Sequence, residues 1–393
     1  MKVYLDHAAT TYVDKEVLQE MMPYFTETFG NANSQHGFGR DAAIAVDKAR
    51  NQIAKALNAK TNEIYFTSGG TEADNWALKG IASANMDKGN HIITTKIEHA
   101  AIHESAKYLE KHGFKVDYLS VDSDGVVDLN ELESLITDKT ILVSVMTANN
   151  EIGTIQPIKQ IGEICKKHKV LFHTDAVQAA GAINLDVKDL GVDLMSISGH
   201  KFYGPKGIGV LYVRTGVKID NLLSGGHQER TKRGGTSNVP AIVGMGKALE
   251  LATTNLEEKS KKIADMRDYF VSEVMKKIPY VTYNGSKTNR LPNNASLSFE
   301  FLEGESILFS LDLEGIASSS GSACSSGSLE PSATLLAIGK APKDAHGTLR
   351  FSFGKDNDYK QIDYTVEKLV EIVERLRNMS PLFYEFKKEN KNV

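Results

Sequence analysis

Short hydrophobic runs alternate with amphipathic segments through the first two thirds of the chain. The apolar runs, bounded by polar or glycine residues, indicate buried strands at residues 63–67, 91–97, 115–121, 140–146, 170–176, 193–198 and 207–213. Hydrophobic positions three and four apart indicate helices at 14–29, 40–58, from 72 onwards, at 99–112 and at 158–168. Apolar strands that alternate with helices favour a mostly parallel sheet covered on both faces, so we expect an α/β fold.

The pattern changes near residue 254. Beyond it we expect a long charged helix with one hydrophobic stripe, three strands and a final helix, at residues 256–278, 280–283, 295–301, 348–353 and 359–379. Helices lie between these strands, and this mixture is typical of an α+β unit. The C-terminal third is therefore expected to form a smaller second domain.

Composition narrows the classes of function. The chain has 393 residues and a formal net charge of −4, which does not favour a nucleic-acid or anionic-membrane surface. No run approaches the roughly 18 apolar residues of a membrane span, and the first residues lack the apolar stretch of a secretory signal. The two cysteines, Cys165 and Cys324, lie in very different surroundings, so we expect no framework disulfide. These features predict a cytoplasmic protein.

Two charged residues stand at the ends of apolar runs. Lys201 follows the run at 193–198, where desolvation can lower the pKa of an amine and make it nucleophilic; the alternative is a surface lysine. Asp175 ends the run at 170–176, where a carboxylate needs a charged partner. A protonated pyridine nitrogen is such a partner, and this pairing makes pyridoxal phosphate (PLP) an electron sink. The alternative for Asp175 is a helix N-cap.

Two further motifs stand between a strand and a helix. In Ser68-Gly-Gly-Thr71-Glu72, glycines and free helix N–H groups could bind a phosphate, or the motif could be an ordinary capped helix start. His99 and His103 are four residues apart and would share a helix face. That spacing suits a metal pair, but no further ligand spacing completes the site. His99 could instead stack on an aromatic ring or transfer protons, or be a partly buried structural histidine.

Cys324 lies in the Ser/Gly-rich stretch 318–328. A cysteine with little apolar company is a candidate nucleophile, and the alternative is a linker with an incidental cysteine. Cys165, in an amphipathic helical pattern, fits an ordinary core position. Arg350 lies in a strand and could bind a carboxylate through two parallel N–H groups, although a surface salt bridge is the commoner case.

These motifs occur together and in a defined order. The matching segments are YLDHAATT, TSGGTEADN, IEHAAI, ANNEIGTIQP, FHTDAVQ, SGHKFYGPKG, RGGTSN, SSGSACSSG and LRFSFG, which span residues 4–354. In these motifs the chain resembles the class V aminotransferase-like PLP enzymes, and within them the NifS/IscS-type cysteine desulfurases. The long Ser/Gly-rich segment around the cysteine resembles group I of those enzymes.

The resemblance implies a fold and an activity. The fold would be that of type I PLP-dependent transferases: a large domain, residues 15–254, on a mixed, mostly parallel seven-stranded sheet, and a small α+β domain, residues 1–14 and 255–393, that carries the cysteine segment 318–328. The enzyme would be a homodimer that converts L-cysteine to L-alanine. The sulfur would pass as a persulfide to Cys324 and on to an iron–sulfur scaffold protein or another acceptor.

The resemblance also assigns roles to single residues. Lys201 would hold PLP covalently and act as an acid and base, Asp175 would pair with the ring nitrogen, and His99 would stack on the ring and transfer protons. The remaining cofactor contacts would come from Gly70, Thr71, Asn150, Gln178, Ser198, His200 and Thr236, the last reaching across from the partner subunit. The substrate carboxylate would be bound by Asn33, Asn150 and Arg350. Cys324 would attack the substrate sulfur; it is also a candidate transient iron–sulfur ligand, and we expect no resident metal.

Three other functions remain open on the sequence alone. A selenocysteine lyase or a class V aminotransferase could use the same fold, and an aminotransferase needs no cysteine at position 324. A sulfur-delivery scaffold, for example for tRNA thiolation, would bind acceptors even without PLP.

Overall fold

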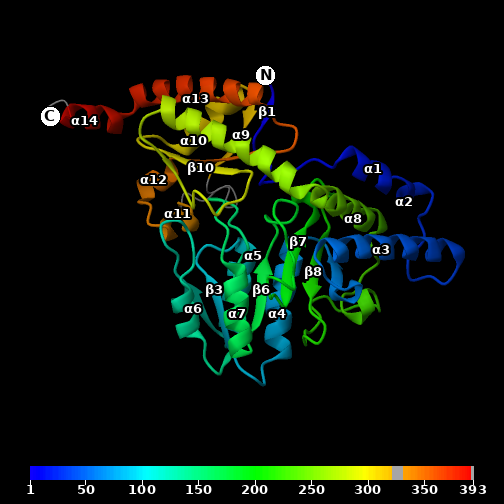
Figure 1. Ribbon diagram of the computed structural model, residues 1–393. Helices are drawn as coiled ribbons and strands as arrows, with labels where there is room; N and C mark the ends of the chain where they lie inside the picture. Colours follow the sequence, from blue (N-terminus) through cyan, green and yellow to red (C-terminus); the bar gives the residue numbers. More distant parts are fainter. Residues whose placement is uncertain (321–330, 391–393) are drawn as a thin grey trace.

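The computed structural model describes residues 1–320 and 331–390, so Cys324 lies outside the described residues. Figure 1 shows a larger body built on one sheet, with a smaller body above it that contains both chain ends. The long helix α9 (Leu256–Lys277) runs from the larger body into the smaller one. No helix among the described residues is long and apolar enough to cross a membrane.

The larger body is built on seven strands. In spatial order they are β2 (Ile64–Thr67), β8 (Gly209–Val213), β7 (Leu194–Ser198), β6 (Leu171–Asp175), β5 (Thr140–Ser144), β3 (His91–Thr95) and β4 (Lys115–Leu119). Only β8 runs antiparallel to its neighbours in this sheet. The strands that the hydrophobic runs predicted therefore form a mixed, mostly parallel sheet, which confirms the predicted fold class.

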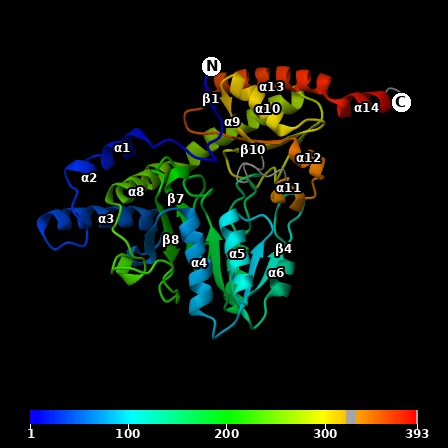
Figure 2. The same cartoon turned by 180° about the vertical axis from the view of Figure 1, so that it is seen from behind.

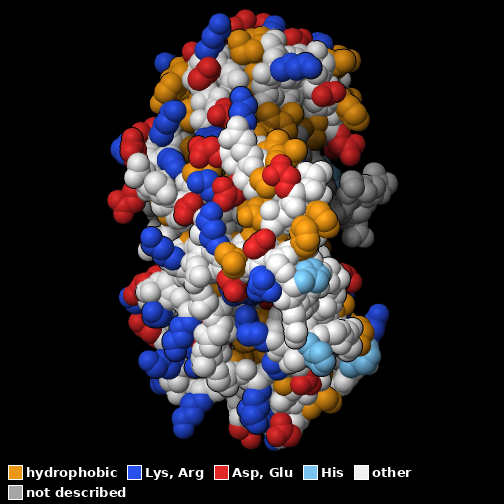
Figure 3. Space-filling view, turned by 90° about the vertical axis from the view of Figure 1, so that its right-hand side faces the viewer, with side chains coloured by type: hydrophobic (Ala, Val, Ile, Leu, Met, Phe, Trp, Pro, Cys, Tyr) orange, Lys and Arg blue, Asp and Glu red, His pale blue; other side chains and the backbone are white. Residues whose placement is uncertain are grey.

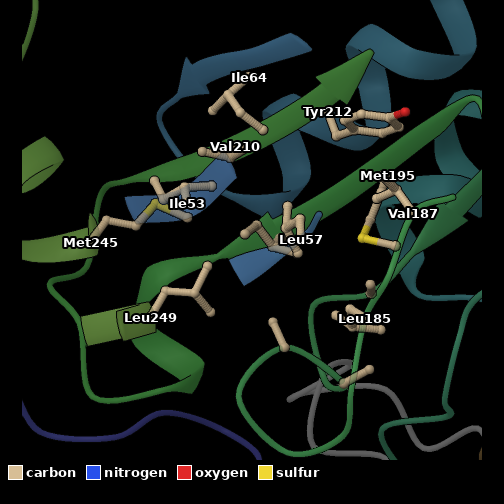
Figure 4. Close-up of a cluster of buried hydrophobic side chains, with 14 of the residues drawn as sticks. Ile53, Leu57, Ile64, Leu185, Val187, Met195, Val210, Tyr212, Met245 and Leu249 are labelled. Carbon is tan, nitrogen blue, oxygen red and sulfur yellow. The ribbon is translucent and has the colours of Figure 1, made fainter. Parts of the chain in front are cut away.

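Helices cover both faces of this sheet (Figures 1 and 2). One face packs against α3 (Gly37–Ala56), α6 (Leu129–Leu135), α7 (Ile158–His168) and α8 (Val239–Thr253), and the other against α4 (Gly70–Ala84) and α5 (Ala100–Lys111). Figure 4 shows part of the first layer, with Ile53 of α3 and Leu57 just after that helix beside Met245 and Leu249 of α8. Because helices cover both faces, the central parallel strands β3, β5, β6 and β7 are buried almost throughout.

The smaller body has its own sheet, with strands in the order β12 (Ser319–Ser320), β13 (Thr348–Ser352), β10 (Asn294–Phe299) and β9 (Val281–Tyr283). Around it lie α9, α10 (Gly304–Leu313), α11 (Ala333–Ala337), α12 (Pro342–His346), α13 (Tyr359–Met379) and α14 (Pro381–Asn390). β1 (Val3–Tyr4) pairs in parallel with β11 (Ile316–Ala317), so Val3 and Leu5 pack into this second core. The domain boundaries at residues 14 and 254 stay a prediction.

One predicted helix is interrupted in the structure, so the prediction of a single helix was wrong. The segment 14–29 forms α1 (Lys15–Met21) and α2 (Pro23–Thr26), because Pro23 has no N–H group and starts the second helix. α3 begins three residues before the predicted start, where the His36 side chain accepts a hydrogen bond from the Gly39 N–H (3.2 Å). α8 was not predicted, because its hydrophobic residues are spread around the helix and leave no polar face to mark a period.

Candidate active site

The predicted site residues gather where parallel strands end. β6 ends at Asp175 and β7 ends at Ser198, and the 3₁₀ helix η2 (Gly199–Lys201) follows at once. His99 follows β3, and Asn150 lies in the segment after β5. In open α/β sheets, ligands bind at the carboxyl edge because the connections there leave a crevice between strands. The fold therefore brings these five residues to one edge of the sheet.

An N-terminal strap, residues 8–11, crosses Lys201. Lys201 Nζ donates hydrogen bonds to the carbonyl oxygens of Ala8 (2.5 Å) and Ala9 (2.9 Å), and Gln178 Nε2 donates to the Ala8 oxygen (3.0 Å). Thr11 Oγ1 donates to the carbonyl oxygen of His200 (2.9 Å). A cavity of about 270 Å³ adjoins Lys201 on the side of α8 and α9. The strap thus orients the lysine amine with a chain segment that comes from the second core.

Asp175 is buried, with 5% of its surface exposed. Its Oδ1 accepts a hydrogen bond from the Val177 N–H (2.8 Å). Burial raises the pKa of the Asp175 carboxyl, while the nearby positive charges of His99 and Lys201 oppose the rise. A cationic ring nitrogen would further stabilise the ionised carboxylate, so this position fits the partner of a pyridine nitrogen.

Two more buried acids lie close to Asp175 and were not predicted as functional. Burial raises the pKa of Asp74 well above its ordinary value and that of Glu98 to about 8, and the Asp175 charge adds to both shifts. Burial lowers the pKa of His173 to about 3, so this ring, 3.7 Å from Asp74, offers no positive charge. Three buried carboxyls cannot all ionise together, and Asp175 is the one with cationic neighbours. Of the three, Asp175 is therefore the carboxyl whose ionised form its neighbours favour most.

The start of α4 approaches the same edge. A Cβ on Gly70 would lie 2.8 Å from Cγ2 of Val177 and 3.6 Å from Cβ of Ser198, so glycine allows this close approach. Gly69 precedes it with a φ of 156°, which side chains disfavour. The first N–H groups of a helix have no partner within the helix and carry its positive dipole end. Gly70 and Thr71 are therefore placed as a phosphate site requires.

Arg350 is buried at the junction of the two bodies. Its Nη1 donates to the Asn150 carbonyl oxygen (3.1 Å) and its Nη2 to Asp6 Oδ1 (3.0 Å). The Nε group is buried and has no hydrogen-bond partner among residues 1–320 and 331–390. A buried arginine with an unused donor fits a carboxylate ligand. The structure thus brings Arg350 next to Asn150 and adds Asp6, which the sequence analysis did not single out; the role of Arg350 and Asn150 in substrate binding stays a prediction.

The other predicted residues are placed as follows. His99 caps α5 through Nδ1, which accepts from the Ala101 N–H (3.1 Å), and His103 stacks on Tyr118. Asn33 is exposed between α2 and α3, where it lines a surface cavity with Ser237. Within the described residues no hydrogen bond joins Asn33 to another predicted site residue. Thr236 lines a cavity of about 210 Å³ together with Ser68. The roles of all of these residues, and of Cys324, stay predictions.

Comparison with known proteins adds independent evidence. The sequence profile of the family named aminotransferase class-V matches residues 3–365. "Cysteine desulfurase IscS" of Clostridium botulinum (strain Hall) is 55% identical over 389 residues, which cover 98% of each chain. A protein of the same name from Methanosarcina thermophila is 55% identical over 97% of this chain and 94% of its own.

Solved structures agree with these sequence relatives. A structure titled "NIFS-LIKE PROTEIN" superposes with a TM-score of 0.91 at 43% identity and covers 96% of this chain and all of its own. Another, titled "SspA in complex with cysteine", has a TM-score of 0.81 at 36% identity and covers 90% of this chain and 99% of its own. The chain therefore belongs to the aminotransferase class-V family of PLP-dependent enzymes and, within it, to the cysteine desulfurases.

Proposed function

We propose that this enzyme converts L-cysteine to L-alanine and moves the sulfur through a persulfide on Cys324. The observation that carries the proposal is the convergence of Lys201, Asp175 and the α4 start at one sheet edge, with Arg350 at the junction beside Asn150. The identity of 55% to proteins named cysteine desulfurase supports the choice of reaction.

The residues present fit PLP. Lys201 would hold the cofactor covalently, Asp175 would pair with the ring nitrogen, and the Gly70 and Thr71 N–H groups would bind the phosphate. Ser198, His200 and Gln178 lie on the same edge or against the strap and would complete the contacts, with His99 stacked on the ring. When bound, PLP supplies an electron sink that stabilises negative charge at the substrate α-carbon.

The chain's own residues perform the remaining tasks. Arg350 and Asn150, with Asn33, would bind the substrate carboxylate and so orient the α-carbon. The carbonyl oxygens of Ala8 and Ala9 orient the Lys201 amine, which takes and returns the proton at that carbon. The Cys324 thiolate would attack the substrate sulfur and form a sulfur–sulfur bond, while the substrate's carbon–sulfur bond breaks, its electron pair stays on the substrate, and the substrate takes up a proton and leaves as alanine. An iron–sulfur scaffold protein in the cytoplasm would accept that sulfur.

The enzyme would act as a homodimer, with Thr236 of the partner subunit reaching the phosphate. Support comes from exposed hydrophobic side chains on α1–α3 and their connections: Leu18, Met22, Phe25, Phe29, Phe38 and Ile44. Figure 3 faces this side and shows hydrophobic groups between charged ones. The Phe29 and Phe38 rings lie 5.7 Å apart. Sedimentation should give a dimer, and Phe29→Asp with Phe38→Asp should give a monomer.

Mass spectrometry tests the proposed reaction. After L-cysteine is added to the purified enzyme, the peptide that contains Cys324 should gain one sulfur atom, and alanine should form. Cys324→Ser should abolish the added sulfur and sulfide release, while the visible absorbance of bound PLP stays. Full sulfide release by Cys324→Ser, or added sulfur on Cys165 instead, would overturn the persulfide route.

A further inference from the structure

The segment that leads into α8, residues 223–238, has an unusual backbone. Glu229, Arg230 and Thr231 all have positive φ values, of 45°, 55° and 67°. A side chain with a Cβ rarely adopts this left-handed region, and three in succession are rarer still. Such a conformation persists only when the surrounding contacts hold it in place. The contacts that hold this segment in its left-handed conformation are therefore a guide to its function.

Two arginine–carboxylate pairs clamp the segment to the larger body. Arg50 binds Glu229 through Nη1 and Nη2, both at 2.8 Å, and Arg233 binds Glu72 through Nε (2.9 Å) and Nη2 (3.0 Å). Both pairs are two-pronged, and all four side chains are at most 21% exposed. Paired donors of this kind fix geometry as well as charge.

Each carboxylate also binds the backbone near the end of β2. Glu229 Oε2 accepts from the Phe66 N–H (3.0 Å), which lies within the strand. Glu72 Oε2 accepts from the Ser68 N–H (2.8 Å), which lies in the turn that leads into α4. The two pairs are therefore alike in form but differ in place, because only the second touches the Ser68–Thr71 turn.

Glu72 is a charged group in an unfavourable place for a phosphate site. It is the third residue of α4, directly after Gly70 and Thr71, and hydrogen bonds to Arg233 and Ser68 lower the pKa of its carboxyl. An ionised carboxylate in the first turn normally benefits from the helix dipole. A phosphate dianion bound at the same helix start would be repelled by it. Arg233 supplies the charge that removes this conflict.

We propose that Arg233 and Glu72 are a positioning pair of the cofactor phosphate site. The arginine cancels the carboxylate charge in the first turn of α4, and the carboxylate holds the Ser68 N–H and so fixes the glycine turn. The same arginine anchors the segment that carries Thr236, the residue that in the proposed dimer would reach the phosphate of the partner subunit. This inference rests on the proposed function, because it takes the α4 start as the phosphate site.

The Arg50–Glu229 pair provides a matched control within the same segment. If both pairs only stabilise the segment, removing either arginine should have the same consequence. If Arg233 supports phosphate binding, loss of Arg233 should weaken the binding of ligands that carry a phosphate group, and loss of Arg50 should not. PLP and pyridoxal differ in that group alone, so their affinities separate the two accounts.

The experiment uses the full chain as wild type, Arg233→Met, Arg233→Met with Glu72→Gln, and Arg50→Met, each freed of PLP. Each is titrated with PLP and with pyridoxal and followed by the visible absorbance of the lysine-bound ligand. Arg233→Met should lose about ten- to thirtyfold in PLP affinity, because the unpaired Glu72 carboxylate would repel a phosphate at the start of the same helix. Its affinity for pyridoxal should not change. Adding Glu72→Gln should restore most of the PLP affinity. Arg50→Met should keep the wild-type ratio of the two affinities.

Three results would overturn the inference. If Arg233→Met keeps the wild-type preference for PLP over pyridoxal, or loses both ligands equally, the pair has no role specific to phosphate. If the double variant binds PLP as weakly as Arg233→Met, charge cancellation is wrong. If the wild-type protein itself binds PLP no better than pyridoxal, the phosphate site of the proposed function fails, and this inference fails with it.

Discussion

The two sides of the site are built in different ways. The cofactor side consists of strand ends and a helix start within one packed body, where Asp175, Ser198 and Lys201 follow buried strands within a few residues. The substrate side is assembled at the junction of two bodies, where Arg350 of the smaller body donates to the Asn150 carbonyl oxygen of the larger one, 200 residues away in the chain. The difference suggests that the cofactor side is rigid by construction, whereas the substrate side depends on how the bodies meet.

The largest expected effect comes from Lys201→Ala on the cofactor side. Without the amine there is no covalent link to PLP and no group to move the α-proton, so alanine formation should fall by about four orders of magnitude. Loss of the visible absorbance band checks the link directly. Lys206→Ala, which removes a nearby lysine that donates a hydrogen bond to the Thr11 carbonyl oxygen, is the control and should keep both. Alanine formation that survives in Lys201→Ala would show that Lys201 is not the residue that holds PLP and moves the proton.

On the substrate side, Arg350→Lys should separate the two regions. Lysine cannot reach Asn150, Asp6 and a substrate carboxylate together, so kcat/KM for cysteine should fall by about ten- to a hundredfold, the cost of one hydrogen bond to a charged group. PLP affinity should not change. Steady-state kinetics and a PLP titration of the same preparation measure the two quantities. An equal loss of PLP affinity would show that the two sides are not independent.

Gly354→Ala tests the connection between the regions. A Cβ at this position would lie 2.2–2.5 Å from three ring atoms of the buried His7, just before the N-terminal strap. Overpacking of this kind should lower the free energy of unfolding by about 1–3 kcal/mol, seen as a lower urea midpoint. Gly37→Ala is the control, because its nearest neighbour atom would be 3.8 Å away. An unchanged midpoint in Gly354→Ala would mean that the strap can shift freely.

A pH dependence on the cofactor side gives the last test of the comparison. Burial raises the pKa of Glu98 in the folded state from its ordinary value of 4.5 to about 8, so between these values the folded state binds a proton that the unfolded state has released. Stability should therefore fall as pH rises through this range, by up to about 1.4 kcal/mol per pH unit from this group. Glu98→Gln cannot release a proton, so its urea midpoint should fall less between about pH 5 and about pH 8. Parallel curves for the two proteins would contradict the assignment of a neutral Glu98.

The sequence motifs located much of the site because strand ends and helix starts are local features. Asp175 and Lys201 follow apolar runs in the sequence. Because the residues after such a run must leave the buried sheet, the sequence alone predicts that both side chains lie at a sheet edge. The predicted helix boundaries were less accurate where a single side chain determines the boundary, as at His36 before α3 and at Pro23 between α1 and α2. The sequence did not predict α8, because a helix with hydrophobic residues on all sides shows no hydrophobic periodicity.

By itself, the sequence determined the alternation of strands and helices, the family, and the chemistry of the residues at the sheet edge. The tertiary structure alone decided which distant groups meet: Ala8 with Lys201, Asp6 with Arg350, Arg233 with Glu72, and two further acids beside Asp175. The physical reason is range. Periodicity and capping act within a few residues, whereas pairing and burial depend on the packing of segments that the chain order does not place together.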